Sequence, residues 1–71
     1  MMSLTKKEKT ICEMILNGMT NREISKYLHR SPHTINSHLK NIYRKNKLKN
    51  RAQLCYTFCM EVKINEKPTQ P

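Results

Sequence analysis

The sequence predicts an all-α fold, a four-helix bundle that contains a helix-turn-helix. Four helix-start signals follow one another along the chain, and each precedes apolar residues spaced three and four apart, which is the helical period. No stretch shows the sustained alternation of apolar and polar residues that a strand requires. With 71 residues, the chain is long enough for one small domain with a thin stability margin.

The first helix is expected near residues 6–17. Thr5 and Glu8 form a capping box, in which each side chain accepts a hydrogen bond from the other residue's backbone N–H. Gly18 is the only glycine in the sequence, and it suits the left-handed residue that commonly follows a helix end. The helical spacing predicts an inward stripe, which consists of Leu4, Ile11, Cys12, Ile15 and Leu16.

The second helix is expected near residues 21–28, where Thr20 and Glu23 repeat the capping box. It is short, and Ile24 and Leu28 are its core positions. These two residues are four apart, so they lie one turn from each other on the same side of the helix.

The third helix is expected near residues 32–46. Ser31 supplies a hydroxyl at the N-cap, and Pro32 occupies the first helical position, where a missing N–H costs nothing. Only His29 and Arg30 separate the second helix from this cap. A short helix, a tight turn and a longer helix together indicate helix-turn-helix geometry.

The fourth helix is expected near residues 51–62. Asn50 and Gln53 form a fourth capping box, with glutamine in place of glutamate. The predicted core stripe consists of Leu54, Cys55, Phe58 and Val62. The end of the chain is polar and broken by proline, so we expect a domain over residues 1–64 and a disordered tail over residues 65–71.

The charge of the chain is strongly basic, with 14 Lys and Arg against five acidic residues and a net charge of +9. No acidic residue lies between Glu23 and Glu61. This interval holds Lys26, Arg30, Lys40, Arg44, Lys45, Lys47, Lys49 and Arg51. A basic surface without a partner is the alternative, but the clustering favours a polyanion, either nucleic acid or an anionic membrane surface.

Other classes of function find little support. The three cysteines, Cys12, Cys55 and Cys59, are odd in number and lack CxxC spacing, which argues against a disulfide framework and a zinc finger. No apolar run approaches the roughly 20 residues that span a bilayer, and Met1 leads directly into patterned sequence without a signal peptide. No acid–base pair or nucleophile has the partners that catalysis needs. We therefore expect a cytoplasmic protein with no enzyme activity, metal, cofactor or membrane partner.

At about 100° per residue, the third helix has two opposite faces. The inward face consists of Ile35, His38, Leu39 and Ile42, with His38 expected as a packed, hydrogen-bonded residue. The polar face consists of His33, Asn36, Ser37, Lys40 and Arg44. Lysine donates to guanine, asparagine pairs with adenine, and serine fits either role. A solvated helix face is the plain alternative, but the preceding short helix and tight turn favour a helix that reads base edges in the major groove.

The spacing of these residues resembles the LuxR-type, or GerE-type, DNA-binding domain. The resemblance covers about residues 4–60 and rests on Leu4-Thr5, Glu8, Gly18, Asn21, Glu23-Ile24, Leu28, Ser31, Thr34-Ile35, His38, Ile42, Lys45 and Asn50-Arg51. It implies a four-helix bundle in a bacterial transcription regulator that binds inverted repeats of duplex DNA as a homodimer at the nucleoid. RNA polymerase is considered as a further partner.

The resemblance also implies roles for individual residues. Asn36, Ser37 and Lys40 would contact bases, and we add His33 from the same face. The residues expected to contact the DNA backbone are Thr20, Asn21, Ser31, Thr34, Arg44 and Lys45. The fourth helix would supply the dimer contact through Leu54, Cys55, Phe58 and Cys59.

The sequence departs from the family pattern at several positions. Lys7 replaces arginine, Ser25 replaces alanine, and Arg30 replaces an apolar residue. Asn46 and Lys47 replace Leu-Gly, so the third helix is expected either to end early or to continue into Lys47. These departures leave room for a second hypothesis, a protein-interaction or antiregulator module that keeps the helix-turn-helix fold.

Overall fold

The computed structural model describes residues 2–65, and within that range the chain forms helices and no strand. The helices are α1 (Lys6–Leu16), α2 (Asn21–Leu28), α3 (Pro32–Asn46) and α4 (Arg51–Asn65). The predicted all-α fold is confirmed. α1 ends one residue earlier than predicted because Asn17 is its C-cap. α4 continues beyond residue 62 and includes the first residue of the predicted tail, whose remaining residues 66–71 lie outside the described range.

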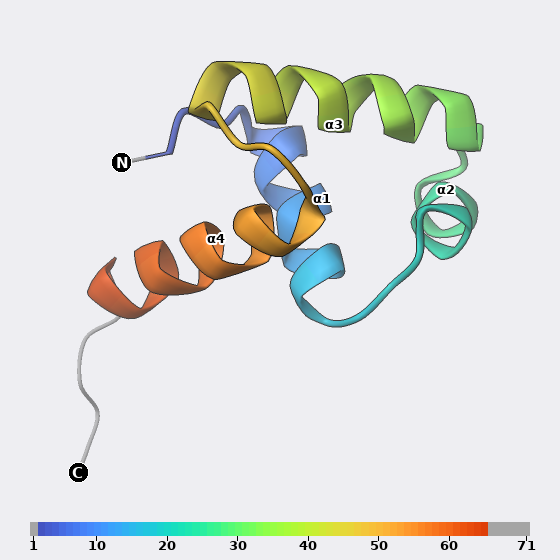
Figure 1. Ribbon diagram of the computed structural model, residues 1–71. Helices are drawn as coiled ribbons and strands as arrows, with labels where there is room; N and C mark the ends of the chain where they lie inside the picture. The colour runs from blue at the N-terminus through green and yellow to red at the C-terminus, as the bar shows by residue number, and fades with distance from the viewer. Residues whose placement is uncertain (1, 66–71) are drawn as a thin grey trace, which may run out of the picture.

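α1 lies at the centre of the fold, between α3 and α4 (Figure 1). α3 packs against both α1 and α2, whereas α4 packs against α1. α2 lies at the N-terminal end of α3, and the segment before α1 lies near the C-terminal end of α3 (Figure 1). The two ends of α3 therefore meet different parts of the chain.

Three helices begin at the predicted N-caps. The Thr5 hydroxyl accepts from the backbone N–H of Glu8 at 3.1 Å, and the Glu8 carboxylate accepts from the backbone N–H of Thr5 at 2.9 Å. Thr20 and Glu23 form the same box at 3.2 and 2.8 Å. The Ser31 hydroxyl accepts from the third residue of α3 at 3.2 Å. Each cap satisfies backbone donors that the helix cannot satisfy itself.

The predicted box at the start of α4 forms only in part. The Asn50 side chain accepts from the backbone N–H of Gln53 at 2.9 Å, as expected. The Gln53 side chain accepts from the backbone N–H of Lys49 at 2.7 Å, instead of from Asn50. The prediction was therefore wrong by one residue, because the long glutamine side chain reaches the preceding turn of the chain.

Within residues 2–65, three helices are followed by a left-handed residue, and one of these three residues is glycine. Gly18 follows α1 at φ +87°, which confirms the predicted terminator. His29 follows α2 at φ +58° and Lys47 follows α3 at φ +56°. α3 thus ends at Asn46, and Lys47 takes a conformation that costs a non-glycine residue roughly 1–2 kcal/mol.

The core joins all four helices. Its buried residues are Ile11, Cys12, Ile15, Ile24, Ile35, Leu39, Ile42, Leu54 and Phe58. Leu4, Leu28, Cys55 and Val62 are partly buried and pack against this core, as their spacing predicted. Leu16 was predicted in the core but is 40% exposed, because α1 ends at this residue and its last turn projects beyond the packed region.

Candidate nucleic-acid interface

The polar face of α3 is exposed. Side chains at the four predicted base-contacting positions, His33, Asn36, Ser37 and Lys40, all lie at the surface. On the opposite side of the helix, Ile35, Leu39 and Ile42 are buried in the core. The helix is therefore fixed by its apolar side and presents a continuous row of donors and acceptors to solvent.

A shallow hollow of about 340 Å³ lies along this polar face. Its lining residues are Asn21, His33, Asn36, Ser37, Leu39, Lys40, Tyr43 and Arg51. The lining contains two cations and no carboxylate, so its electrostatic character favours an anionic or hydrogen-bond-accepting ligand. Burial raises the pKa of the Tyr43 hydroxyl, although the nearby Arg51 charge acts in the opposite direction.

A chain of hydrogen bonds connects three helices beside the hollow. Arg51, the first residue of α4, donates from Nη1 to Oδ1 of Asn21 at 2.8 Å. Its Nη2 donates to the backbone carbonyl of Met19 at 2.7 Å. Asn21 in turn donates from Nδ2 to Oδ1 of Asn36 at 2.7 Å. The orientation of a predicted base-contacting side chain therefore depends on residues in α2 and α4.

The predicted backbone-contacting residues fall into two groups, one at the N-termini of α2 and α3 and one of cations further along α3. Thr20 and Ser31 cap the N-termini of α2 and α3, where unpaired backbone N–H groups attract anions. The Thr34 hydroxyl lies 3.1 Å from that of Ser31. Arg44 lies exposed on α3 and donates to the side chain of Asn41 at 3.0 Å.

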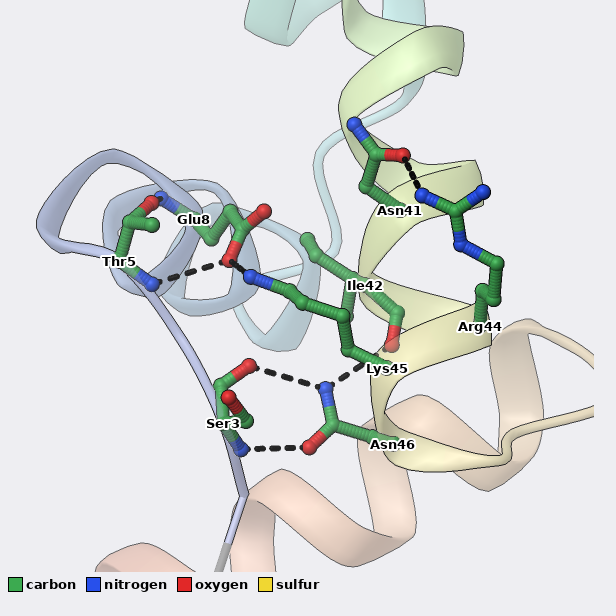
Figure 2. Close-up of polar contacts among 8 residues, drawn as sticks. All are labelled: Ser3, Thr5, Glu8, Asn41, Ile42, Arg44, Lys45 and Asn46. Carbon is green, nitrogen blue, oxygen red and sulfur yellow. Dashed lines mark hydrogen bonds and ion pairs between the residues drawn. The ribbon is translucent and has the colours of Figure 1, made fainter.

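Lys45, the last of the predicted backbone-contacting residues, forms an ion pair within the fold. Its Nζ lies 2.6 Å from Oε1 of Glu8, the carboxylate that also caps α1 (Figure 2). The Glu8 side chain is only 7% exposed, and that of Lys45 is 34% exposed. Burial raises the pKa of Glu8, but the Lys45 ammonium and the hydrogen bonds from Thr5 outweigh it, so the net pKa is lowered. The ion pair therefore connects the C-terminal part of α3 to the start of α1.

Asn46 forms a second connection to the start of the chain. Its Oδ1 accepts from the backbone N–H of Ser3 at 2.6 Å, and its Nδ2 donates to the Ser3 carbonyl at 3.2 Å (Figure 2). The same Nδ2 donates to the carbonyl of Ile42 at 2.9 Å. The backbone N–H of Met2 donates to the Glu61 carboxylate at 2.7 Å. The N-terminal segment is thus held between α3 and α4.

The predicted dimer-contacting residues of α4 differ in exposure. Leu54 is 0% exposed and Phe58 is 3% exposed, so both belong to the core of the fold. Cys55 and Cys59 are half-buried. Within residues 51–62, the exposed large apolar residues are Tyr56 and Met60, at 69% and 41%. The exposed apolar surface of this range therefore lies on a second side of the helix.

All three cysteines are free thiols. Burial, with a smaller contribution from the Glu8 charge, raises the pKa of the Cys12 thiol to about 11. Within residues 2–65 no cluster of three metal-ligating side chains occurs, and no helix in that range has the length and apolar character to cross a membrane. His38 was predicted to be packed and hydrogen-bonded. It is half-buried, but its imidazole makes no hydrogen bond to another residue of the described range, so the hydrogen-bonding part of this prediction was wrong.

Comparison with known proteins identifies the family. Residues 2–58 match the family model described as bacterial regulatory proteins, luxR family. This chain belongs to the luxR family. The predicted resemblance is thereby confirmed over most of the described residues. No solved structure matches the chain.

Several curated proteins that resemble this chain are named as transcriptional regulators. An HTH-type transcriptional regulator of Mycobacterium bovis is 38% identical over 52 residues, which are 73% of this chain and 6% of that protein. The HTH-type transcriptional regulator YhjB of Escherichia coli is 37% identical over 51 residues, 72% of this chain and 26% of the relative. This luxR-family chain therefore spans only a small part of the curated relatives that it matches.

Four of the departures from the luxR-family pattern have structural explanations, and nothing in the structure explains Lys7. Arg30 is exposed in the turn after α2, so a charged side chain is tolerated there. Ser25 is buried at 3% exposure, and its hydroxyl donates to the carbonyl of Arg22 at 2.7 Å. Asn46 exchanges an apolar contact for hydrogen bonds to the N-terminal segment. Lys47 takes the left-handed conformation that glycine would otherwise occupy.

Sequence reasoning missed the roles of Arg51 and Asn46. Both were identified in the sequence, Arg51 as part of a motif and Asn46 as a departure from one. Their partners lie 30 and 43 residues away along the chain. Helical periodicity reports only which residues share a face of one helix, so it carries no signal for such contacts.

Proposed function

We propose that this chain is a sequence-specific DNA-binding domain of a bacterial transcription regulator, acting in the cytoplasm at the nucleoid. The observation that carries the proposal is the exposed row of His33, Asn36, Ser37 and Lys40 along a hollow without carboxylates. These side-chain types form hydrogen bonds with base edges, and a helix of this size fits the major groove.

The phosphate backbone would be contacted on either side of α3. The N-termini of α2 and α3 supply backbone donors beside Thr20 and Ser31, and Asn21 and Thr34 lie next to them. Arg44 supplies an exposed cation on the same helix as the base-contacting residues. Lys45 is the weakest member of the predicted set, because its ammonium is paired with Glu8. The net charge of +9 supports a salt-dependent affinity for DNA.

We further propose a homodimer on an inverted repeat, with α4 as the contact. The side of α4 that carries Tyr56 and Met60 is exposed, and the half-buried Cys55 and Cys59 border it. Symmetric pairing of this side would cover the largest exposed aromatic residue of the helix. Sedimentation of the protein with and without a palindromic duplex measures whether two copies bind together.

The experiment that tests the proposal compares two substitutions by competition binding. We expect Lys40→Ala to reduce the preference for a selected duplex over random DNA by roughly tenfold, because a base contact is lost. We expect Arg44→Ala to weaken binding to both duplexes about equally, because a phosphate contact carries no sequence information. Equal losses of preference for the two variants contradict this division.

A titration of affinity against salt separates DNA binding from a protein-interaction role. A DNA-binding domain loses affinity steeply as salt rises, because each neutralised phosphate releases counterions. A slope near zero in a plot of log affinity against log salt would instead favour the protein-interaction module that the departures from the family pattern had suggested.

A further inference from the structure

We propose that Arg51 and Asn21 are specificity-determining residues, which hold the side-chain amide of Asn36 in one orientation, with Oδ1 on the side of Asn21, and so fix how its donor and its acceptor meet a base. This inference rests on the proposed function, in which Asn36 faces the major groove. Neither Arg51 nor Asn21 would need to touch a base itself.

The orientation starts from the guanidinium of Arg51, which can only donate hydrogen bonds. It makes two of them, from Nη1 to Asn21 and from Nη2 to the backbone carbonyl of Met19, at 2.8 and 2.7 Å. The carbonyl belongs to the main chain, so it cannot exchange its role as acceptor. The planar group is therefore fixed at two points, and its Nη1 donor must meet an acceptor.

The orientation of the Asn21 amide, and then that of the Asn36 amide, follows from this donor. An asparagine amide carries one acceptor oxygen and one donor nitrogen, which exchange places when the group rotates by half a turn. The donor-only guanidinium requires Oδ1 of Asn21 on its side. Nδ2 of Asn21 is thereby turned toward Asn36, at 2.7 Å from its Oδ1. Within residues 2–65, Nδ2 of Asn36 makes no hydrogen bond, so it is available to a ligand.

The environment supports a fixed arrangement. Arg51 and Asn21 are half-buried, whereas Asn36 is exposed. All three line the hollow along α3, together with Lys40. Arg51 and Asn21 are thus held within the fold, and of the three hydrogen-bonded residues only Asn36 faces solvent.

The consequence is that the Asn36 amide meets a base in one orientation. Oδ1 of Asn36 has two lone pairs, so it can accept from Asn21 with one and still offer the other to a base beside the Nδ2 donor. The usual pairing of asparagine with adenine uses this combination, in which Oδ1 accepts from the adenine amino group while Nδ2 donates to N7. We therefore infer that the bond from Asn21 fixes which way round the donor and the acceptor of Asn36 meet the base.

The decisive variant is Asn21→Asp. A carboxylate at this position still accepts from Arg51, but it cannot donate to Asn36. The Asn36 amide then gains by rotating, so that Nδ2 donates to the new carboxylate and the donor and the acceptor of Asn36 exchange places. The expected result is a change of the selected base at one position per half-site. Relative affinity at that position should change by about tenfold or more.

Two further variants separate the inference from general effects. Asn41→Asp adds the same charge to the surface of α3 outside this chain of hydrogen bonds, so it should lower affinity without changing any selected base. Asn21→Ala removes the donor without offering a new acceptor, so the preference at the same position should relax and not invert. Thermal unfolding of each variant establishes that the fold is retained.

The experiment selects duplexes from a random pool with the wild-type chain and with each variant. If the wild-type chain selects no sequence at all, the proposed DNA-reading function fails. If it selects a sequence, and Asn21→Asp and Asn21→Ala leave every selected base unchanged, the proposed function stands and this inference is overturned.

Discussion

Asparagine and lysine occur in two parts of α3, residues 32–44 and its C-terminal end, residues 45–46, and the two parts use them differently. In the first part, Asn36 and Lys40 are exposed along the hollow. At the C-terminal end, Asn46 holds the backbone of Ser3, and Lys45 pairs with Glu8 (Figure 2). The start of α3 packs on the short α2, and its C-terminal end lies beside the N-terminal segment and the start of α1 (Figure 1).

The difference shows that residue type does not decide between a structural and a DNA-contacting role. The decisive property is whether another part of the chain lies within reach of the side chain. A lysine beside a buried carboxylate stabilises the fold, whereas a lysine beside a hollow without carboxylates is available to a ligand. The following predictions test this division of α3, beginning with the largest expected effect.

Removing the carboxylate of Glu8 should have the largest effect. Glu8→Ala deletes one half of the α1 capping box and leaves the Lys45 ammonium without its partner. Because Glu8 is almost completely buried, we expect the free energy of unfolding to fall by about 2 kcal/mol. Urea unfolding followed by circular dichroism measures this loss.

The control for this variant is Glu8→Gln, which keeps an acceptor for the backbone N–H of Thr5 but removes the charge. It should lose less stability than Glu8→Ala. A loss below about 0.5 kcal/mol for Glu8→Ala, the size of an ordinary surface substitution, would contradict a structural role for the C-terminal end of α3.

Replacing Lys47 should stabilise the domain. Lys47 holds a left-handed conformation at the end of α3, which glycine adopts without steric cost. Relief of this conformation in Lys47→Gly should raise the free energy of unfolding by about 1 kcal/mol. The net gain should be smaller, because glycine has a greater backbone entropy in the unfolded chain. The shift in the urea midpoint checks this value.

Gly18 provides the matched opposite case. A Cβ added at Gly18 meets nothing within 4 Å, so the cost of Gly18→Ala comes from the backbone conformation alone. It should destabilise by about 1 kcal/mol. If both substitutions shift stability in the same direction, the left-handed helix end is not the cause.

Acid should weaken the connection between the C-terminal end of α3 and α1, which depends on the charge of Glu8. The pKa of Glu8 is lower in the folded chain than its ordinary value of 4.5. A depressed carboxyl pKa stabilises the fold above the ordinary value, and this stabilisation is lost as pH falls through the folded value. We therefore expect the stability difference between wild type and Glu8→Gln to be constant near neutral pH and to shrink below about pH 4.5. A difference that does not vary with pH would show that the charge of Glu8 contributes nothing.

The sequence predicted the four helices and most of the core because both depend on local signals. Caps such as Thr5 and Ser31 act within three residues, and helical spacing identifies the inward side of each helix. The same signals identified the exposed face that carries Asn36 and Lys40. Leu16 was misplaced because spacing cannot tell where a packed region ends.

The contacts between distant parts of the chain were beyond prediction. Lys45 was assigned to the DNA backbone from the family pattern, although its ammonium lies against Glu8, which is 37 residues away in the sequence. The network from Arg51 to Asn36 was missed for the same reason. Such contacts depend on how helices pack, and periodicity within one helix contains no information on packing.

Lys45 and Arg44 are neighbours in the sequence, and together they provide the finest test of the division. We expect Arg44→Ala to reduce the slope of log affinity against log salt by about 1, as the loss of one phosphate contact does. We expect Lys45→Met to leave that slope unchanged, because the Lys45 ammonium is already neutralised by Glu8. Methionine keeps the unbranched apolar stem and removes only the charge.

The double variant Lys45→Met with Glu8→Gln removes both charges and so avoids a buried, unpaired carboxylate. If its salt slope equals that of the wild type, the ion pair belongs to the fold in the DNA-bound state as well. If Lys45→Met and the double variant both reduce the slope by as much as Arg44→Ala, then Lys45 leaves Glu8 when DNA binds. The family-based assignment of Lys45 to the backbone would then be right, and the boundary between the two parts of α3 would lie beyond residue 45.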